Sequence, residues 1–187
     1  MNRLLLLVLV TALSALAVPA QRREFLTDGE IFQIREAQEP NARLKLYIQF
    51  ARERLNAVEK ALAGNDADRG AYIHDNLREY DQIIDAVDHN AEQAVKKRDL
   101  ARKGLELALQ EEPEFLKLLQ GFQARNPKDL EQYRFILSQA IETTEGSIEV
   151  LREALGKQPK GRKEEKEEKQ EKKKLQEPRG KKKEWRK

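Results

Sequence analysis

Three long segments of the chain repeat apolar residues at alternating spacings of four and three, which is the spacing of one face of a helix. The first stripe is Leu44, Ile48, Ala51, Leu55, Val58 and Leu62. The second is Ile73, Leu77, Tyr80, Ile84, Val87, Ala91 and Ala94. The third is Leu130, Tyr133, Leu137, Ile141, Thr144, Ile148, Leu151 and Leu155. Because a lone helix cannot bury such a stripe, we expect the three stripes to face one another.

The rest of the pattern favours helices as well. Ala, Leu, Glu, Lys, Gln and Arg, all good helix formers, dominate the chain, and no segment shows the two-residue alternation of a strand. We therefore predict an all-α fold. Residues 21–156 form an antiparallel helical bundle of three long helices plus short capping helices. Residues 157–187 form a Lys/Glu-rich basic tail that is disordered or partly helical.

Helix boundaries can be placed from Pro, Gly and Asn residues. Pro40 suits the first turn of the first long helix, and Gly64 suits its end. Asn126 and Pro127 suit the N-cap and first position of the last helix, which Gly156 closes.

The middle of the chain admits two interpretations, because the apolar phase slips around residues 96–100. One is a continuous helix over residues 69–110 with a stutter, and the other is a break near Asn90. We favour the continuous helix, since no Pro or Gly interrupts residues 71–103. Pro113 then starts a short apolar helix through Phe122 that caps one end of the bundle, and a small helix over residues 30–37 does the same.

The first twenty residues read as a secretory signal peptide. Arg3 precedes an apolar run over residues 4–16, and Val18 and Ala20 form a small-residue cleavage pattern before Gln21. The run is short for a bilayer span, which needs about 20 apolar residues. We expect an exported protein, periplasmic or secreted, with no transmembrane span after cleavage. The absence of cysteine favours a bacterial envelope protein over a disulfide-stapled animal domain.

Charge is divided unevenly along the chain. Residues 157–187 carry 15 Lys or Arg against 7 Asp or Glu, a net of +8, whereas residues 21–156 carry 20 against 26, a net of −6. Such a tail indicates a charged partner surface, self-masking of the body, or a solubility device. The residues that would rest on an anionic envelope surface are Lys172, Lys173, Lys174, Lys181, Lys182, Lys183 and Trp185. Nucleic acid would attract the same charges, but an exported protein is not expected to meet it.

Residues that could carry chemistry are few. Asp85, His89 and Glu92 share one face of the second predicted helix, so they are the candidates for a metal site, although charged side chains are expected there anyway because this face lies opposite the apolar stripe. Cysteine is absent, no Gly-x-Ser-x-Gly elbow occurs, and no glycine-rich loop follows a strand. We therefore predict that the protein is not an enzyme and has no cofactor.

The chain contains the strings IREAQEPN at residues 34–41, LKLL at 116–119 and QYRF at 132–135. Through these strings it resembles an uncharacterised group of exported, all-helical bacterial proteins with no known activity. The resemblance covers about residues 28–155 and implies a helical exported protein without functional residues to transfer.

These observations favour a non-enzymatic exported protein that acts by contact with a protein or with the envelope surface. The alternative is a periplasmic chaperone or scaffold, whose clients would bind the apolar residues between Phe115 and Phe122. A metal-binding bundle that uses His89 is the third hypothesis.

We expect the precursor to be cut near Ala20 during export. N-terminal sequencing of the protein from its native host should find a chain that begins close to Gln21. An intact Met1 on protein recovered from the cytoplasm would contradict this expectation.

Overall fold

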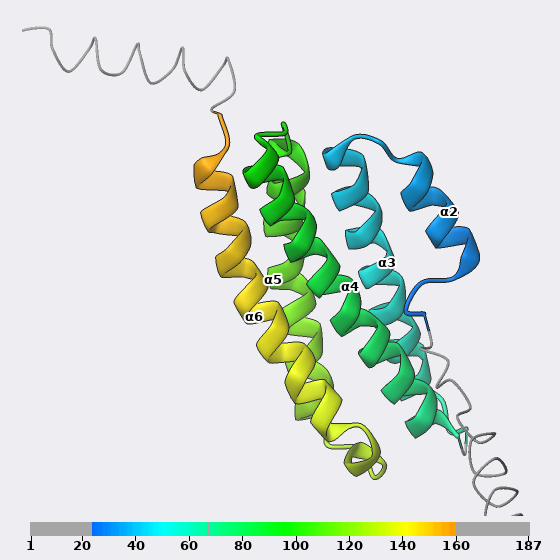
Figure 1. Cartoon of the computed structure of the whole chain (residues 1–187). Coiled ribbons are helices and arrows are strands. Elements are labelled where there is room, and N and C mark those ends of the chain that lie inside the picture. Colours follow the sequence, from blue (N-terminus) through cyan, green and yellow to red (C-terminus); the bar gives the residue numbers. More distant parts are fainter. Residues whose placement is uncertain (1–23, 67, 160–187) are drawn as a thin grey trace, which may run out of the picture.

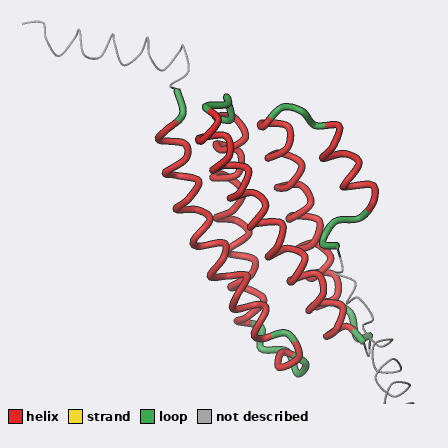
Figure 2. Tube along the Cα trace, viewed as in Figure 1, coloured by secondary structure: helices red, strands yellow, loops and turns green. Residues whose placement is uncertain are grey.

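A computed structural model describes residues 24–66 and 68–159 (Figures 1 and 2). The helices are α2 (Asp28–Glu36), α3 (Pro40–Ala63), α4 (Arg69–Lys97), α5 (Arg102–Ala124) and α6 (Arg134–Lys157), with a 3-10 turn, η2 (Leu130–Gln132). The described part of the chain has no strand, so the all-α fold class is confirmed. The expected signal peptide and tail residues 160–187 lie outside the described residues. None of the described helices is long and apolar enough to cross a membrane.

The four long helices pack in the cyclic order α3, α4, α6, α5, so that each has its main contacts with two neighbours. In Figure 1, α3 and α5 run down the view, whereas α4 and α6 run up. Helices that are consecutive in sequence are therefore antiparallel, as expected. The neighbours α4 and α6 are parallel to each other, however, because α4 and α5 lie across the diagonal of the bundle.

The three apolar stripes form the core. The second stripe is buried over its whole length, and the first is buried from Leu44 to Val58. In the third stripe, Ile141 and Leu155 are partly buried and the other residues are buried. Each large side chain that is removed from water contributes about 1.5–3 kcal/mol, so the stripes supply most of the driving force for packing.

The middle of the chain differs from both interpretations of its sequence. A continuous helix over residues 69–110 is wrong, and so is a break near Asn90. Helix α4 ends at Lys97, Arg98 takes a left-handed conformation with φ of 59°, and α5 begins at Arg102. The bundle thus has four long helices where the sequence predicted three.

Tertiary hydrogen bonds hold the turn between α4 and α5, residues 98–101, on two sides. Asn41, in the first turn of α3, donates from Nδ2 to the Leu100 carbonyl at 2.9 Å and accepts from the Gly104 N–H at 2.8 Å. On the other side, Gln158 Oε1 accepts from the Ala101 N–H at 3.2 Å. Asn41 and Gln158 are remote in sequence from the turn, so local pattern alone does not reveal its position.

The apolar segment after Pro113 is not a separate capping helix. Pro113 lies inside α5, and Phe115, Leu119 and Phe122 are at most 1% exposed in the bundle core. This burial contradicts the idea that these three side chains form an exposed client-binding patch.

The last helix begins later than expected. Asn126 does not cap it but has φ of 43°, and η2 separates residues 126–127 from α6. Arg69 holds the segment before η2 by donating to both carboxylate oxygens of Asp129 at 2.8 Å. It also donates to the Gly64 carbonyl at 2.5 Å. The helix then runs through Gly156 to Lys157. The positions of Pro40 and Gly64 at the two ends of α3 are confirmed.

Two glycines of α5 give a matched test of the α3–α5 packing. A Cβ atom at Gly104 would lie 2.8 Å from Leu44 Cδ1 and 3.1 Å from Asn41 Cα, whereas one at Gly121 would meet nothing within 4 Å. We expect Gly104→Ala to lower the free energy of unfolding by about 1–3 kcal/mol through overpacking. Gly121→Ala should raise it by about 0.5–1 kcal/mol through helix propensity. Urea denaturation measures both, and equal effects would contradict the close approach of α3 and α5.

Candidate functional site

Residues 24–36, here called the arm, lie beside the bundle and include α2. The start of α2 is set locally by a capping box: Thr27 Oγ1 accepts from the Glu30 N–H at 3.3 Å, and Glu30 Oε2 accepts from the Thr27 N–H at 2.7 Å. The arm contacts mainly α3 among the long helices. Its attachment to the bundle therefore depends on few contacts.

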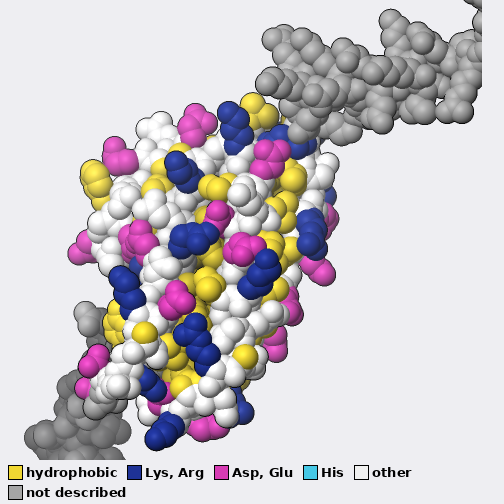
Figure 3. Space-filling view, turned by 180° about the vertical axis from the view of Figure 1, so that it is seen from behind, with side chains coloured by type: hydrophobic (Ala, Val, Ile, Leu, Met, Phe, Trp, Pro, Cys, Tyr) yellow, Lys and Arg dark blue, Asp and Glu magenta, His cyan; other side chains and the backbone are white. Residues whose placement is uncertain are grey.

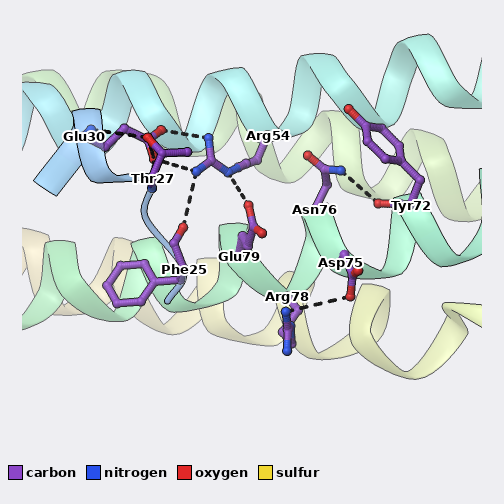
Figure 4. A network of polar contacts seen from close by, with 9 residues as sticks. All are labelled: Phe25, Thr27, Glu30, Arg54, Tyr72, Asp75, Asn76, Arg78 and Glu79. Atoms are coloured by element: carbon purple, nitrogen blue, oxygen red, sulfur yellow. Dashed lines mark hydrogen bonds and ion pairs between the residues drawn. The ribbon is translucent and has the colours of Figure 1, made fainter. Parts of the chain in front are cut away.

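One buried charge network anchors the arm (Figure 4). Arg54 of α3 donates to both carboxylate oxygens of Glu30 at 2.8 Å, to Glu79 of α4 at 2.7 Å, and to the Phe25 carbonyl at 3.2 Å. Burial alone would raise the pKa of Glu30, but the hydrogen bonds and charge of Arg54, together with Thr27, hold that pKa below its usual value. Removal of one partner from such a buried pair costs about 3–5 kcal/mol.

A groove of about 890 Å³ lies between the arm and the surface of α3 and α4. Both apolar and polar side chains line it, a mixture that is typical of binding sites. The apolar lining residues are Phe25, Leu26, Ile31, Tyr47 and Ala86. The polar lining residues are Glu24, Arg35, Gln82, Asp85, His89 and Asn90. We refer to it as the arm groove.

The three candidate metal ligands all lie on α4. Asp85 and His89 line the arm groove, whereas Glu92 lines a different hollow between α4 and α6, beside Val95 and Val150. No group of three or more His, Cys, Asp or Glu side chains in the described part of the chain is arranged to hold a metal ion. Burial, and then the charge of Asp81, raise the pKa of Asp85. The lining also carries the carboxyl group of Glu24 and the guanidinium group of Arg35.

The candidate residues for an anionic surface are outside the described residues. They are the tail residues Lys172, Lys173, Lys174, Lys181, Lys182, Lys183 and Trp185. Contact between the tail and an envelope surface therefore stays a prediction.

Sequence reasoning missed a buried carboxyl centre formed by Asp88 of α4, Glu112 of α5 and Ser147 of α6. Ser147 Oγ lies 2.5 Å from Asp88 Oδ1 and 3.1 Å from Glu112 Oε1. A hydroxyl has one proton, so Ser147 can donate to only one of these carboxyls. The two contacts are satisfied together when Glu112 is protonated and donates to Ser147, which in turn donates to Asp88.

The electrostatics of this centre agree with a protonated Glu112. Its side chain is fully buried, and burial, with a smaller contribution from the charge of Asp88, raises its pKa to about 8 despite the Ser147 hydrogen bond. Burial and the charges of Asp85 and Glu92 raise the pKa of Asp88 to about 6. The centre therefore holds a proton at neutral pH.

The comparisons with known proteins add no relative. No protein-family model matches this chain, and neither a curated protein nor a solved structure shows significant similarity to it. The resemblance to exported helical proteins therefore stays a prediction.

The buried carboxyl centre predicts a distinctive pH dependence. Between about pH 4.5 and pH 8, the unfolded chain has released the Glu112 proton and the folded chain has kept it. The free energy of unfolding should therefore fall through this window by up to about 1.4 kcal/mol per pH unit from this group, and level off above it. Glu112→Gln should remove this fall in the free energy of unfolding and stabilise the fold at pH 8 by roughly 4 kcal/mol.

Denaturation at several pH values measures this difference. The control is Glu142→Gln, which removes an exposed carboxyl from α6 and should leave the pH dependence of the wild type nearly unchanged. Parallel pH profiles for the wild type and Glu112→Gln would contradict a protonated Glu112.

Proposed function

We propose that the protein is exported, is not an enzyme, and binds a segment of a protein partner in the arm groove. The observation that carries the proposal is the way in which the arm is held. Arg54 anchors it through Glu30 and the Phe25 carbonyl, while a groove stays open between the arm and the α3–α4 surface. Export is supported by the apolar leader over residues 1–20.

The lining of the groove favours one kind of partner segment. Apolar side chains come from both walls, Phe25 and Ile31 from the arm and Tyr47 from α3, so an apolar side chain can be buried between them. The carboxylates of Glu24 and Asp85 lie on the same lining. A partner segment that places an apolar side chain beside a Lys or Arg matches both features.

The other functional hypotheses have less structural support. A chaperone that captures clients on residues 115–122 is disfavoured because the largest of these side chains form core packing. A metal-binding bundle is disfavoured because no group of three or more His, Cys, Asp or Glu side chains among the described residues is arranged to hold a metal ion.

Site-specific photo-crosslinking in the native host tests the proposal. A photoreactive amino acid at Gln82, in the groove lining, should form a covalent adduct with a protein partner. The same amino acid at Gln120, an exposed position on α5, should not form that adduct.

Charge reversal then tests the chemistry of the partner. Asp85→Lys in the Gln82 background should remove most of the adduct, because it places a cation where the partner's cation binds. Glu106→Lys, an equal charge change at an exposed position on α5, should leave the adduct intact. Identical adducts from both crosslinker positions, or no effect of Asp85→Lys, would refute the proposal.

A further inference from the structure

The acidic charge of the folded body is concentrated on two neighbouring helices. Residues 79–95 of α4 carry five carboxylates and residues 135–151 of α6 carry three, and neither stretch contains a Lys or Arg. We call the outer surface of these two stretches the acidic face. Glu92, Glu142, Glu145 and Glu149 are exposed on it.

Three hydrogen bonds between α4 and α6 place the two acidic stretches at the same height. Asp81 accepts from Gln139 at 2.6 Å, Tyr80 and Thr144 share a hydrogen bond of 2.8 Å, and Ser147 donates to Asp88 at 2.5 Å. Because α4 and α6 are parallel neighbours, the exposed Glu92 of α4 lies on a helix adjacent to the one that carries the exposed Glu142, Glu145 and Glu149.

Cations lie at the edges of this face, where Arg54 pairs with Glu79 and Lys96 lines the same hollow as Glu92. Among the described residues, the exposed Glu142, Glu145 and Glu149 form no ion pair. The outer ion pairs of α4 and α6 lie at the helix ends, where Arg78 pairs with Asp75 and Lys157 pairs with Glu153. One carboxylate oxygen of Asp81, a residue only 4% exposed, has no hydrogen-bond partner among the described residues. The charges of Asp85 and Glu92 also raise the pKa of Asp88, after burial, which indicates repulsion that is not relieved.

The opposite side of the molecule has no such imbalance. Figure 3 shows Lys and Arg side chains interspersed with Asp and Glu over this side. Ion pairs between or within α3 and α5 account for this pattern, among them Arg125 with Glu59 at 3.5 Å and Lys117 with Glu114 at 2.6 Å. The acidic face therefore differs in the arrangement of its charges as well as in their number.

The chain itself supplies a segment of matching charge. Residues 160–171 carry five Lys or Arg and five Asp or Glu, whereas residues 172–187 carry nine and two, a net of +7. The neutral stretch of twelve residues can extend to about 40 Å. From Gln158 back to Glu142 along α6 is only about 24 Å, at 1.5 Å per residue. Residues 172–187 can therefore reach the whole acidic face.

We propose that the acidic face of α4 and α6 is the docking surface for the chain's own cationic segment, residues 172–187, bound within the same molecule. The segment neutralises carboxylates that the bundle leaves unpaired. Docking depends on charge, so it weakens as the Debye length shrinks from about 10 Å at 0.1 M salt to about 3 Å at 1 M. At low salt, docking therefore hides the lysine clusters of the segment. At high salt the segment leaves the acidic face, and its lysine clusters can then bind competing anions.

Trp185 gives a direct readout, because it is the single Trp of the chain and lies within the cationic segment. In the full chain, its fluorescence anisotropy should be high at low salt and fall at high salt to that of an isolated 172–187 peptide. The combined variant Glu92→Gln, Glu142→Gln, Glu145→Gln and Glu149→Gln should show the low value at every salt concentration. Circular dichroism verifies that the variant is folded.

A control variant removes the same charge elsewhere. Glu36→Gln, Glu53→Gln, Glu59→Gln and Glu114→Gln neutralise exposed carboxylates of α2, α3 and α5, and this variant should keep the salt-dependent anisotropy of the wild type. Low Trp185 anisotropy in the full chain at low salt would overturn the proposal. An equal loss of anisotropy in both variants would overturn it as well. Anisotropy that falls on dilution would show binding between copies and would overturn docking within one molecule.

Discussion

The turn at residues 98–101 decides which helices of this bundle touch. Because it crosses the end of the bundle, α4 and α5 lie on a diagonal and α4 becomes the parallel neighbour of α6. Asn41 from α3 and Gln158 after α6 hold the turn from its two sides. The acidic face, the α4–α6 hydrogen bonds and the approach of Glu112 to Ser147 all follow from this crossing.

Two buried polar clusters have different physical roles in this framework. Arg54 and Glu30 form a paired charge network that orients the arm, and the two hydrogen bonds that Arg54 donates to Glu30 offset the desolvation of both groups. Among the described residues Glu112 has no cationic partner at the centre it shares with Ser147, so protonation replaces ion pairing as the means of neutralising it. The first cluster fixes a surface element, and the second couples core packing to pH.

Helix α4 contributes to both surfaces for which we propose a function. One side of it forms the floor of the arm groove through Ala86 and His89, and the adjoining side carries the acidic face through Glu92. Asp85 of α4 lines the arm groove, and its raised pKa reflects burial and its neighbour Asp81. A cationic partner segment and the cationic tail would therefore meet related electrostatic potentials on adjacent surfaces.

The sequence by itself determined the all-α class, the core stripes and the division of charge between body and tail. These properties follow from helical periodicity and composition, which are local, so the buried residues from Ile73 to Ala94 could be identified without a structure. Part of the site was also foreseeable, since Asp85 and His89 do share a surface. Only the tertiary structure decided the turn at Arg98, the position of Pro113 inside α5 and the meeting of Asp88 with Glu112 at Ser147. Each of these depends on contacts between residues far apart in sequence, whose energies no local pattern contains.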